Sequence, residues 1–347
     1  MELNGKTILV TGSPGFIGSN LVIRLLSEMT SGVIVSLDEM NDYYDVSLKR
    51  WRLEQIRKAS EQSGVKHIFV RGSISDSHLV NILFDRFRFD IVVNLAAQAG
   101  VRYSIDNPEA YINSNIIGFF NIIEACRNHP VKHLVYASSS SVYGNNTKIP
   151  FSTEDKTDGP VSLYAATKKS NELMAHAYSK LYGIPSTGLR FFTVYGPAGR
   201  PDMFYYSATE KLCRGDKIKV FNHGNMDRDF TYIDDIIEGV VRVMRFPPAG
   251  QDIQFAVYNI GGGQPENLMC FIETLKEELV RAGVLSEDFN LNEHIEFVGM
   301  QPGDVTTTFA DSSPLEKDFG FTPKIGIREG LRAFAEWYRD YSFKNRA

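Results

Sequence analysis

The stretch ILVTGSPGFIGSNL, residues 8–21, decides the fold of this chain. An apolar run leads into three glycines, Gly12, Gly15 and Gly18, and apolar residues at helical spacing follow them. Glycines in this arrangement allow a tight turn, let a phosphate approach the backbone and permit close packing of a helix on a strand. The first turn of the helix then offers unpaired N–H groups to an anion. We therefore expect a strand, a dinucleotide-binding loop and a helix.

The details of this loop and of the next apolar run narrow the expected ligand. Pro14 has no N–H, so the N–H groups of Phe16 and Ile17 are the expected phosphate donors. Asp38 ends the next β-branched run, where a carboxylate can accept from both ribose hydroxyls and repel a 2′-phosphate. This favours NAD over NADP. Taken alone, the glycines would also suit an ordinary tight turn, and Asp38 could cap the turn before EMND.

Outward from this stretch, short β-branched runs alternate with longer segments of helical periodicity. Strands that are apolar on both faces and alternate with helices indicate an α/β fold of Rossmann type, with a doubly wound parallel sheet. A long helix is predicted at 162–182. The predicted strands are 7–12, 32–38, 66–72, 90–97, 133–139, 186–192 and 255–261.

The pattern changes after about residue 193, where glycine, proline and aromatic residues become dense. The run at 255–261 again looks like a strand of the main sheet. We therefore predict a smaller, discontinuous C-terminal lobe that binds the substrate. Residues 1–192, with a return segment at about 234–262, would form the NAD-binding domain. The ranges 193–233 and 263–347 would form the lobe.

Composition excludes several classes of partner. The chain has 347 residues, 43% hydrophobic and 23% charged, with a net charge of -5 and no long block of one sign. Nucleic acid and anionic membranes are therefore not expected partners. No apolar run reaches the ~18 residues of a membrane span. Cys126, Cys213 and Cys270 lack metal-like spacing, so reduced cysteines in a cytoplasmic protein without a metal are expected.

Tyr164 and Lys168 are candidates for acid/base chemistry. They stand four residues apart in YAATK, so a helix places them on one face. An ammonium beside a phenol favours the phenolate, as does the positive end of a bound nicotinamide, and we expect both to lower the pKa of Tyr164 toward neutrality. Such a pair is also common on ordinary amphipathic helices. The glycine loop upstream and the hydroxyls of YASSSSVYG, residues 136–144, support the functional interpretation.

The ordered series TGSPGFIG, YASSSSVYG, YAATK, LRFFTVYGP, RDFTYIDDI and QPGDVTTTFAD covers essentially the whole chain. It resembles the extended short-chain dehydrogenase/reductases that act on nucleotide sugars. Within that group the chain most resembles the UDP-glucuronate 4-epimerases. The particular points of likeness are NDYYDVSLKRWRLE (41–54), AGVRYS (99–104), GRPDM (199–203) and MQPGDV (300–305).

The resemblance assigns roles to individual residues. Tyr164 would take the proton of the C4 hydroxyl as hydride passes to NAD, and Lys168 would hold the nicotinamide ribose. Ser139 falls at the catalytic serine or threonine of the family. The substrate-binding candidates are Arg102, Thr193 and Arg200 toward the sugar carboxylate and diphosphate, Arg228 toward the UDP moiety, and Asp304 on the nucleotide side.

Further cofactor contacts follow the third and fourth predicted strands. Ser73 stands where relatives usually carry an aspartate for the adenine end. Asn115, on a helix, is expected to support the wall beside the cofactor, although ordinary packing would explain the wall residues equally well. The cofactor set comprises Gly12, Gly15, Phe16, Ile17, Gly18, Asp38, Ser73, Ile74, Leu95, Ala96, Ala97, Gln98 and Asn115, together with Tyr164 and Lys168.

The serine run bears on the outcome of the reaction. A 4-keto glucuronide is a β-keto acid, which loses carbon dioxide readily. Related decarboxylases carry a glutamate directly before VYG, and related dehydratases carry Asp-Glu there. Here these positions are Ser140 and Ser141. Hydroxyls can hold the carboxylate near the plane of the carbonyl and disfavour cleavage of the C–C bond. Plain turn and cap roles compete for both serines.

The sequence thus predicts reversible C4 epimerisation of UDP-glucuronate to UDP-galacturonate with tightly bound NAD. The alternative is a UDP-hexose or UDP-N-acetylhexosamine 4-epimerase, in which Arg200 would serve the phosphates only. Decarboxylase or dehydratase activity is less favoured because of Ser140 and Ser141. A non-catalytic NAD-binding regulator would not need Ser139, Tyr164 and Lys168 together. By resemblance, the helices at about 107–128 and 161–182 would form a homodimer interface.

Overall fold

A computed structural model describes residues 1–300 and 306–346. Its main element is a seven-stranded parallel sheet in the order β10-β6-β5-β4-β1-β2-β3. The strands are β1 (Thr7–Thr11), β2 (Val33–Asp38), β3 (Lys66–Arg71), β4 (Ile91–Asn94), β5 (His133–Ser139), β6 (Ser186–Phe191) and β10 (Phe255–Ile260). The predicted doubly wound α/β fold is confirmed.

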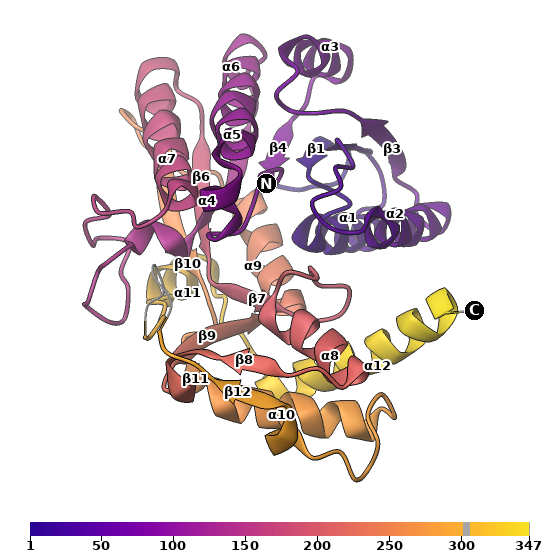
Figure 1. Ribbon diagram of the computed structural model, residues 1–347. Helices are drawn as coiled ribbons and strands as arrows, with labels where there is room; N and C mark the ends of the chain where they lie inside the picture. Colours follow the sequence, from indigo (N-terminus) through magenta and orange to yellow (C-terminus); the bar gives the residue numbers. More distant parts are fainter. Residues whose placement is uncertain (301–305, 347) are drawn as a thin grey trace.

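Helices cover both faces of the sheet (Figure 1). One face carries α1 (Phe16–Glu28), α2 (Val46–Glu61) and α9 (Ile233–Arg245). The other carries α3 (Ser77–Phe87), α6 (Phe119–Asn128) and α7 (Leu163–Tyr182). Alternate residues of β1 show why the strands are apolar throughout. Ile8 and Val10 are buried under the first set of helices, and Leu9 is buried under the second.

The strand β10 joins the main sheet although it lies late in the chain. It pairs in parallel with β6, Phe255 opposite Ser186 and Ile260 opposite Phe191. The helix α9, which precedes it, packs against α1. The chain therefore returns to the sheet after an excursion, while the boundaries proposed for the two lobes stay a prediction.

The excursion and the C-terminal part form a second body below the sheet (Figure 1). It contains a three-stranded sheet β11-β9-β7 and a two-stranded sheet β12-β8. Its strands are β7 (Thr193–Tyr195), β8 (Ile218–Val220), β9 (Asp227–Tyr232), β11 (Pro265–Asn267) and β12 (Ile295–Phe297). Its helices are α8 (Phe204–Arg214), η3 (Phe221–Gly224), α10 (Leu268–Arg281), η4 (Leu291–His294), α11 (Ser313–Phe319) and α12 (Ile327–Arg346).

The segment predicted as one helix at about 107–128 is interrupted in the structure. Two short turns, α4 (Tyr103–Asp106) and α5 (Pro108–Tyr111), lead into a π-helix η1 (Ile112–Gly118) before α6 begins. A π-helix accommodates an extra residue in the helical turn and is frequent at functional sites. Here η1 contains Asn115, whose side chain points at the wall of the central cavity.

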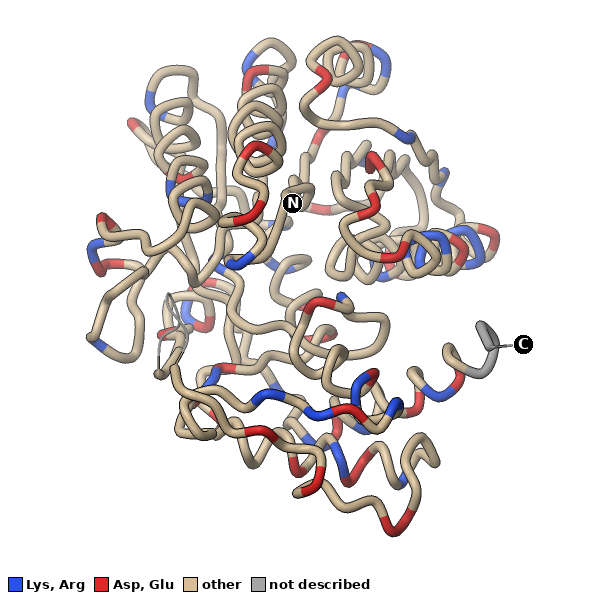
Figure 2. Tube along the Cα trace, in the orientation of Figure 1, with Lys and Arg blue, Asp and Glu red and all other residues tan. Residues whose placement is uncertain are grey.

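Acidic and basic residues alternate along the trace (Figure 2), in keeping with the mild net charge of -5. Among residues 1–300 and 306–346, no helix is both long and apolar enough to cross a membrane.

Candidate active site

A cavity of about 850 Å³ opens at the carboxyl ends of the parallel strands, between the sheet and the second body. This is the edge at which open α/β sheets bind their ligands. Most residues predicted for the site line it. These are Gly12, Gly15, Phe16, Ile17, Gly18, Asp38, Ser73, Ile74, Leu95, Ala96, Ala97, Gln98, Arg102, Ser139, Ser140, Ser141, Tyr164, Lys168, Thr193 and Arg200.

The glycine loop fits a dinucleotide phosphate. Gly15 is the N-cap of α1 and no side chain caps the helix, so the first-turn N–H groups are open to an anion. A Cβ on Gly18 would lie 2.2 Å from the carbonyl oxygen of Gly12. A Cβ on Gly12, whose φ is +71°, would lie 2.8 Å from the backbone nitrogen of Ala96. The three glycines are therefore required by the closeness of helix, loop and neighbouring strand.

Asp38 stands at the end of β2 with a buried cation beside it. Its Oδ1 accepts from the backbone of Met40 at 2.7 Å and lies 3.8 Å from Nζ of Lys49. Burial raises the pKa of the Asp38 carboxyl, and the charge of Lys49 opposes that rise. The carboxylate faces the cavity where NAD would place its adenosine ribose.

Asn115 supports the cavity wall without lining the cavity. Its Oδ1 accepts from the backbone nitrogen of Gln98 at 2.8 Å, and its Nδ2 donates to the carbonyl oxygen of Gln98 at 3.0 Å. It is buried and also donates to the hydroxyl of Thr167 on α7. The side chain thus joins the wall to the helix that carries Tyr164. It is not among the residues that line the cavity, and its membership of the cofactor set stays a prediction.

Tyr164 and Lys168 come from the first two turns of α7. Ser162 caps this helix by accepting from the backbone nitrogen of Ala165 at 3.1 Å. The Nζ of Lys168 donates to the carbonyl oxygen of Ala137 on β5 at 2.8 Å. Burial lowers the pKa of Lys168 to about 8. This contact brings the lysine to the end of the strand that carries the serine run.

The expected lowering of the Tyr164 pKa by Lys168 does not appear in the structure. Burial raises the pKa of Tyr164, while a hydrogen bond with Ser139 and the charge of Arg200 oppose that rise. The reason is geometric, since the lysine ammonium is directed at the carbonyl oxygen of Ala137. The prediction from the spacing was therefore wrong about which neighbour tunes the phenol.

The four serines have two kinds of surroundings: Ser138 is bound to Glu172, and the other three form part of the cavity wall. Ser138 is buried and donates to Oε1 of Glu172 at 2.7 Å, which gives it a structural role. Ser139 ends β5, and its hydroxyl accepts from the backbone nitrogen of Ser141 at 3.2 Å, capping the short helix η2 (Ser140–Tyr143). The hydroxyls of Ser139 and Ser141 lie 3.2 Å apart. The cavity wall here therefore carries hydroxyls of the serine run and no carboxylate from it.

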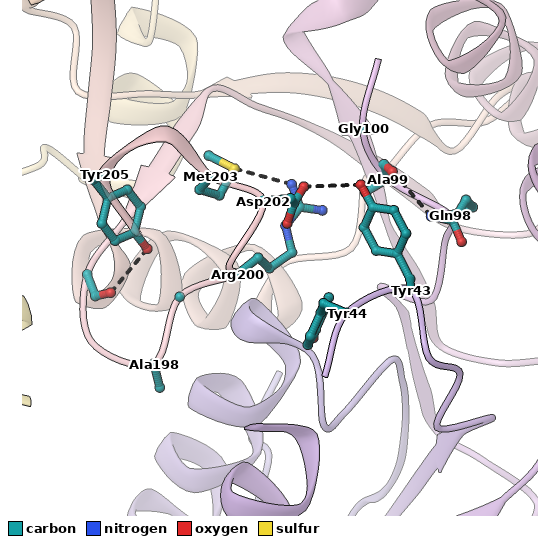
Figure 3. A network of polar contacts seen from close by, with 12 residues as sticks. Tyr43, Tyr44, Gln98, Ala99, Gly100, Ala198, Arg200, Asp202, Met203 and Tyr205 are labelled. Carbon is teal, nitrogen blue, oxygen red and sulfur yellow. Dashed lines mark hydrogen bonds and ion pairs between the residues drawn. The ribbon is translucent and has the colours of Figure 1, made fainter. Parts of the chain in front are cut away.

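The substrate side of the cavity holds two of the predicted arginines. Arg200 lies between Asp202 and Met203, with its Nε 3.4 Å from Oδ1 of Asp202 and its Nη2 3.3 Å from Sδ of Met203 (Figure 3). Arg102 lies over the ring of Phe221 at 5.1 Å. Both side chains can meet an anionic ligand.

One predicted substrate residue, Arg228, is not brought to this cavity. Arg228 on β9 is not among the lining residues, and its Nη1 donates to the carbonyl oxygens of Asp227 and Thr306, each at 2.9 Å. Asp304 lies outside the described residues.

The sequence analysis missed several lining side chains. They are Tyr43, Tyr44, Lys49, Tyr103, Asp202, Met203 and Phe221. The stretches 41–54 and 199–203 were singled out by resemblance, but only Arg200 among their residues was given a role. Part of this could have been predicted from α2. Lys49 and Arg52, two cations three residues apart, lie on the same helix face as the buried Leu48 and Ile56, which indicates that both cations are buried.

Comparison with known proteins agrees with this geometry. A family model described as the NAD dependent epimerase/dehydratase family matches residues 8–261. Protein CapI of Staphylococcus aureus is 45% identical, with 96% of this chain and 98% of the relative covered. UDP-glucuronate 4-epimerase 4 of Arabidopsis thaliana is 44% identical, with 97% of this chain and 76% of the relative covered.

A solved structure shares the whole architecture. UDP-glucuronic acid 4-epimerase from Bacillus cereus, crystallised with UDP-glucuronic acid and NAD, superposes with a TM-score of 0.82 at 31% identity. The match covers 96% of this chain and 99% of the other.

Proposed function

This chain belongs to the NAD-dependent epimerase/dehydratase family, and on that premise we propose that it interconverts UDP-glucuronate and UDP-galacturonate by epimerisation at C4. One observation carries the proposal. Tyr164, Lys168 and Ser139 line the same cavity as Arg200, and Ser140 and Ser141 occupy the positions where decarboxylases and dehydratases of this kind carry carboxylates.

The chain supplies the acid/base and binding groups for this reaction. Bound NAD supplies the acceptor and donor of hydride at C4. Tyr164 would hold the proton that leaves the C4 hydroxyl and return it when the alcohol is formed again. Ser139, which lines the cavity together with Tyr164, would bind the same oxygen. Lys168 would bind the nicotinamide ribose in place of the carbonyl oxygen of Ala137.

The serine hydroxyls would decide the fate of the keto sugar. After oxidation at C4, the C5 carboxylate is β to a ketone and can leave as carbon dioxide. Ser140 and Ser141 line the cavity and can donate to that carboxylate, holding it near the carbonyl plane, where the breaking bond overlaps poorly with the π system. Thr193 and Arg200 would add a donor and a positive charge on the same side.

The direct test is incubation of the purified protein with UDP-glucuronate without added NAD, followed by NMR. We expect UDP-galacturonate and no carbon dioxide, with NAD carried through purification by the protein. A pentose product with carbon dioxide would contradict the role given to Ser140 and Ser141. Turnover of UDP-glucose or UDP-N-acetylglucosamine in place of the uronate would assign the chain to the alternative, with Arg200 serving the phosphates only.

We further propose a homodimer built on α6, α7 and the π-helix beside them. These neighbouring helices expose apolar side chains at 41–69% of their area, namely Ile112, Ile117, Phe120, Leu173 and Leu181. An exposed apolar patch of this kind marks an interface. A Leu173→Glu variant should halve the mass measured by light scattering, and a wild-type protein already of single-chain mass would contradict the dimer.

A cytoplasmic location is proposed on the cysteines. Cys126, Cys213 and Cys270 are all free thiols in the structure, which suits a reducing compartment. Cell fractionation that places the protein in an oxidising compartment would contradict this location.

A further inference from the structure

The loop before α2 and the first turns of that helix, residues 41–52, contact both the cofactor loop and the substrate side of the cavity. Within this segment Arg52 is 1% exposed and among the largest fully buried side chains. Its guanidinium donates to three backbone carbonyls and to the hydroxyl of Tyr44, the last at 2.6 Å. These residues belong to the NDYYDVSLKRWRLE stretch, and the proposed catalytic mechanism assigns them no role.

The carbonyls that Arg52 binds come from two loops far apart in the sequence. Nε and Nη2 donate to Ala198 at 3.0 and 2.8 Å, and Nη2 also donates to Gly199 at 2.9 Å. Nη1 donates to Pro14, in the glycine loop, at 3.1 Å. One side chain therefore joins the loop that would hold the cofactor diphosphate to the residues directly before Arg200.

The loop at 198–203 needs such support. Ala198 has a φ of +53°, a left-handed conformation that costs free energy for a residue with a Cβ. A Cβ on Gly199 would lie 1.6 Å from the hydroxyl of Tyr205, so this residue has no room for a side chain. Arg52 fixes both carbonyls at this strained turn and thereby fixes the direction in which the chain reaches Arg200.

The far end of the same loop is held from the same segment. The hydroxyl of Tyr43 lies 3.3 Å from Oδ2 of Asp202, and Oδ1 of that carboxylate lies 3.4 Å from Nε of Arg200 (Figure 3). Tyr43 is held in turn by the ring of Tyr103, with centroids 4.8 Å apart. Residues 41–52 thus grip the loop on both sides of Arg200.

The positive charge of Arg52 connects these loop contacts with cofactor binding. Among the described residues, Arg52 forms no ion pair within 4 Å, and its partners are carbonyls and a phenol. The carboxylate of Asp38 acts on Arg52 only from beyond ion-pair distance. A buried cation without a close counter-charge is unfavourable, and a further nearby anion offsets that cost. The diphosphate of NAD would be such an anion if it binds at the start of α1, where Gly15 leaves the first-turn N–H groups uncapped.

We propose that Arg52 is a positioning residue for Arg200. With Tyr43 it clamps residues 198–203, and the anionic diphosphate of NAD strengthens the clamp, so that cofactor binding prepares the substrate side of the cavity. The inference rests on the proposed function only for the identity of the substrate. The clamp itself requires only that NAD binding orders residues 198–203 and that this loop then binds a UDP group.

Hydrogen–deuterium exchange tests the clamp without any turnover. Peptides that cover residues 196–204 should exchange at least about fivefold faster in Arg52→Met and in Tyr43→Phe than in the wild-type holoenzyme. Removing NAD from the wild type should produce the same increase, and should change the Arg52→Met variant little. Arg57→Met is the matched control, because Arg57 lies on the same helix but pairs with Glu54 and Glu61 at the surface. Equal exchange in Arg52→Met and Arg57→Met would overturn the proposal.

A double-mutant cycle on UDP binding separates positioning from loss of structure. Calorimetric titration with UDP should show about tenfold weaker binding for Arg52→Met and for Arg200→Met. If Arg52 acts through Arg200, the double variant should bind no more than about twofold worse than Arg200→Met alone. Fully additive losses would overturn the proposal, as would unchanged binding in Arg52→Met.

Two further variants keep the test decisive. If Arg52→Met fails to fold, Tyr43→Phe removes a single hydroxyl and gives the same readout from the other side of the loop. Arg52→Lys keeps the charge but cannot reach three carbonyls, and should resemble Arg52→Met if geometry matters. If UDP-glucuronate is not epimerised at all, the proposed function fails, while the exchange and UDP titrations still decide the clamp.

Discussion

Replacing Tyr164 with phenylalanine should lower kcat for epimerisation by about 10²–10⁴-fold, the range expected for losing a general acid/base. Phenylalanine keeps the ring, which packs edge-on against Tyr111 with centroids 6.0 Å apart. It removes only the hydroxyl, which is the group proposed to hold the proton. The glycine loop and Asp38 are untouched, so NAD should remain bound. Stopped assays of UDP-galacturonate formation measure kcat. The absorbance of the cofactor released on denaturation measures how much NAD is bound.

Tyr178→Phe provides the matched control for this result. Tyr178 lies on the same helix, outside the cavity, and donates its hydroxyl to Glu124 at 2.9 Å. Its replacement should leave kcat within about twofold. If Tyr164→Phe turned over like the wild type, Tyr164 would not be the acid/base. If neither protein turned over any UDP-sugar while both bound NAD, a regulator that only senses the cofactor would be the better description.

The sheet could be predicted from the sequence because its signal is local. Strands such as residues 133–139 are apolar on both faces, and the structure places β5 at the predicted residues. The helix at 107–128 was less predictable. The π-helix around Asn115 inserts a residue into the turn. The side chain of Asn115 contacts Gln98 and Thr167 there, and apolar periodicity reveals neither the insertion nor these contacts.

The candidate site shows the same division. The glycines, Tyr164 and Lys168 could be predicted because their spacing within one segment carries the chemistry. The roles of Arg52 and Asp202 could not be predicted. They depend on contacts with residues about 150 positions away, which no local pattern encodes. The predicted direction of the pKa shift of Tyr164 was wrong for a related reason. Burial is set by the whole fold, and here it outweighs the neighbours that spacing suggested.

Replacing Glu172 with methionine should lower the free energy of unfolding by about 3–5 kcal/mol, because it leaves Arg190 as an unpaired buried cation. The two side chains are 3% and 4% exposed. Arg190 on β6 donates to both oxygens of Glu172 on α7, at 2.8 and 2.9 Å, and Ser138 on β5 donates to the first of them. Because α7 carries Tyr164 and β5 carries Ser139, kcat should fall as well.

The pH dependence of this loss has a definite sign. Burial alone would raise the pKa of the Glu172 carboxyl, but its hydrogen bonds and ion pair with Arg190 outweigh burial and lower it below 4.5. A carboxyl whose pKa is lower in the folded state stabilises the fold above its unfolded value and loses that contribution as the pH falls. The difference in melting temperature between wild type and Glu172→Met should therefore be full at pH 7 and shrink below pH 4.5.

A second replacement distinguishes loss of the ion pair from loss of packing. If the cost of Glu172→Met comes from the stranded cation, adding Arg190→Met should restore part of the stability, although Ser138 would still lack the partner that Glu172 provides. Tyr143 would lose its bond from Arg190 but keep the one that it donates to Asn259. Glu54→Met, which breaks an exposed pair with Arg57, should leave the free energy of unfolding nearly unchanged. A double variant less stable than Glu172→Met would show that Arg190 is supported well enough by Tyr143, and that the pair does not join α7 to the sheet in the way its geometry indicates.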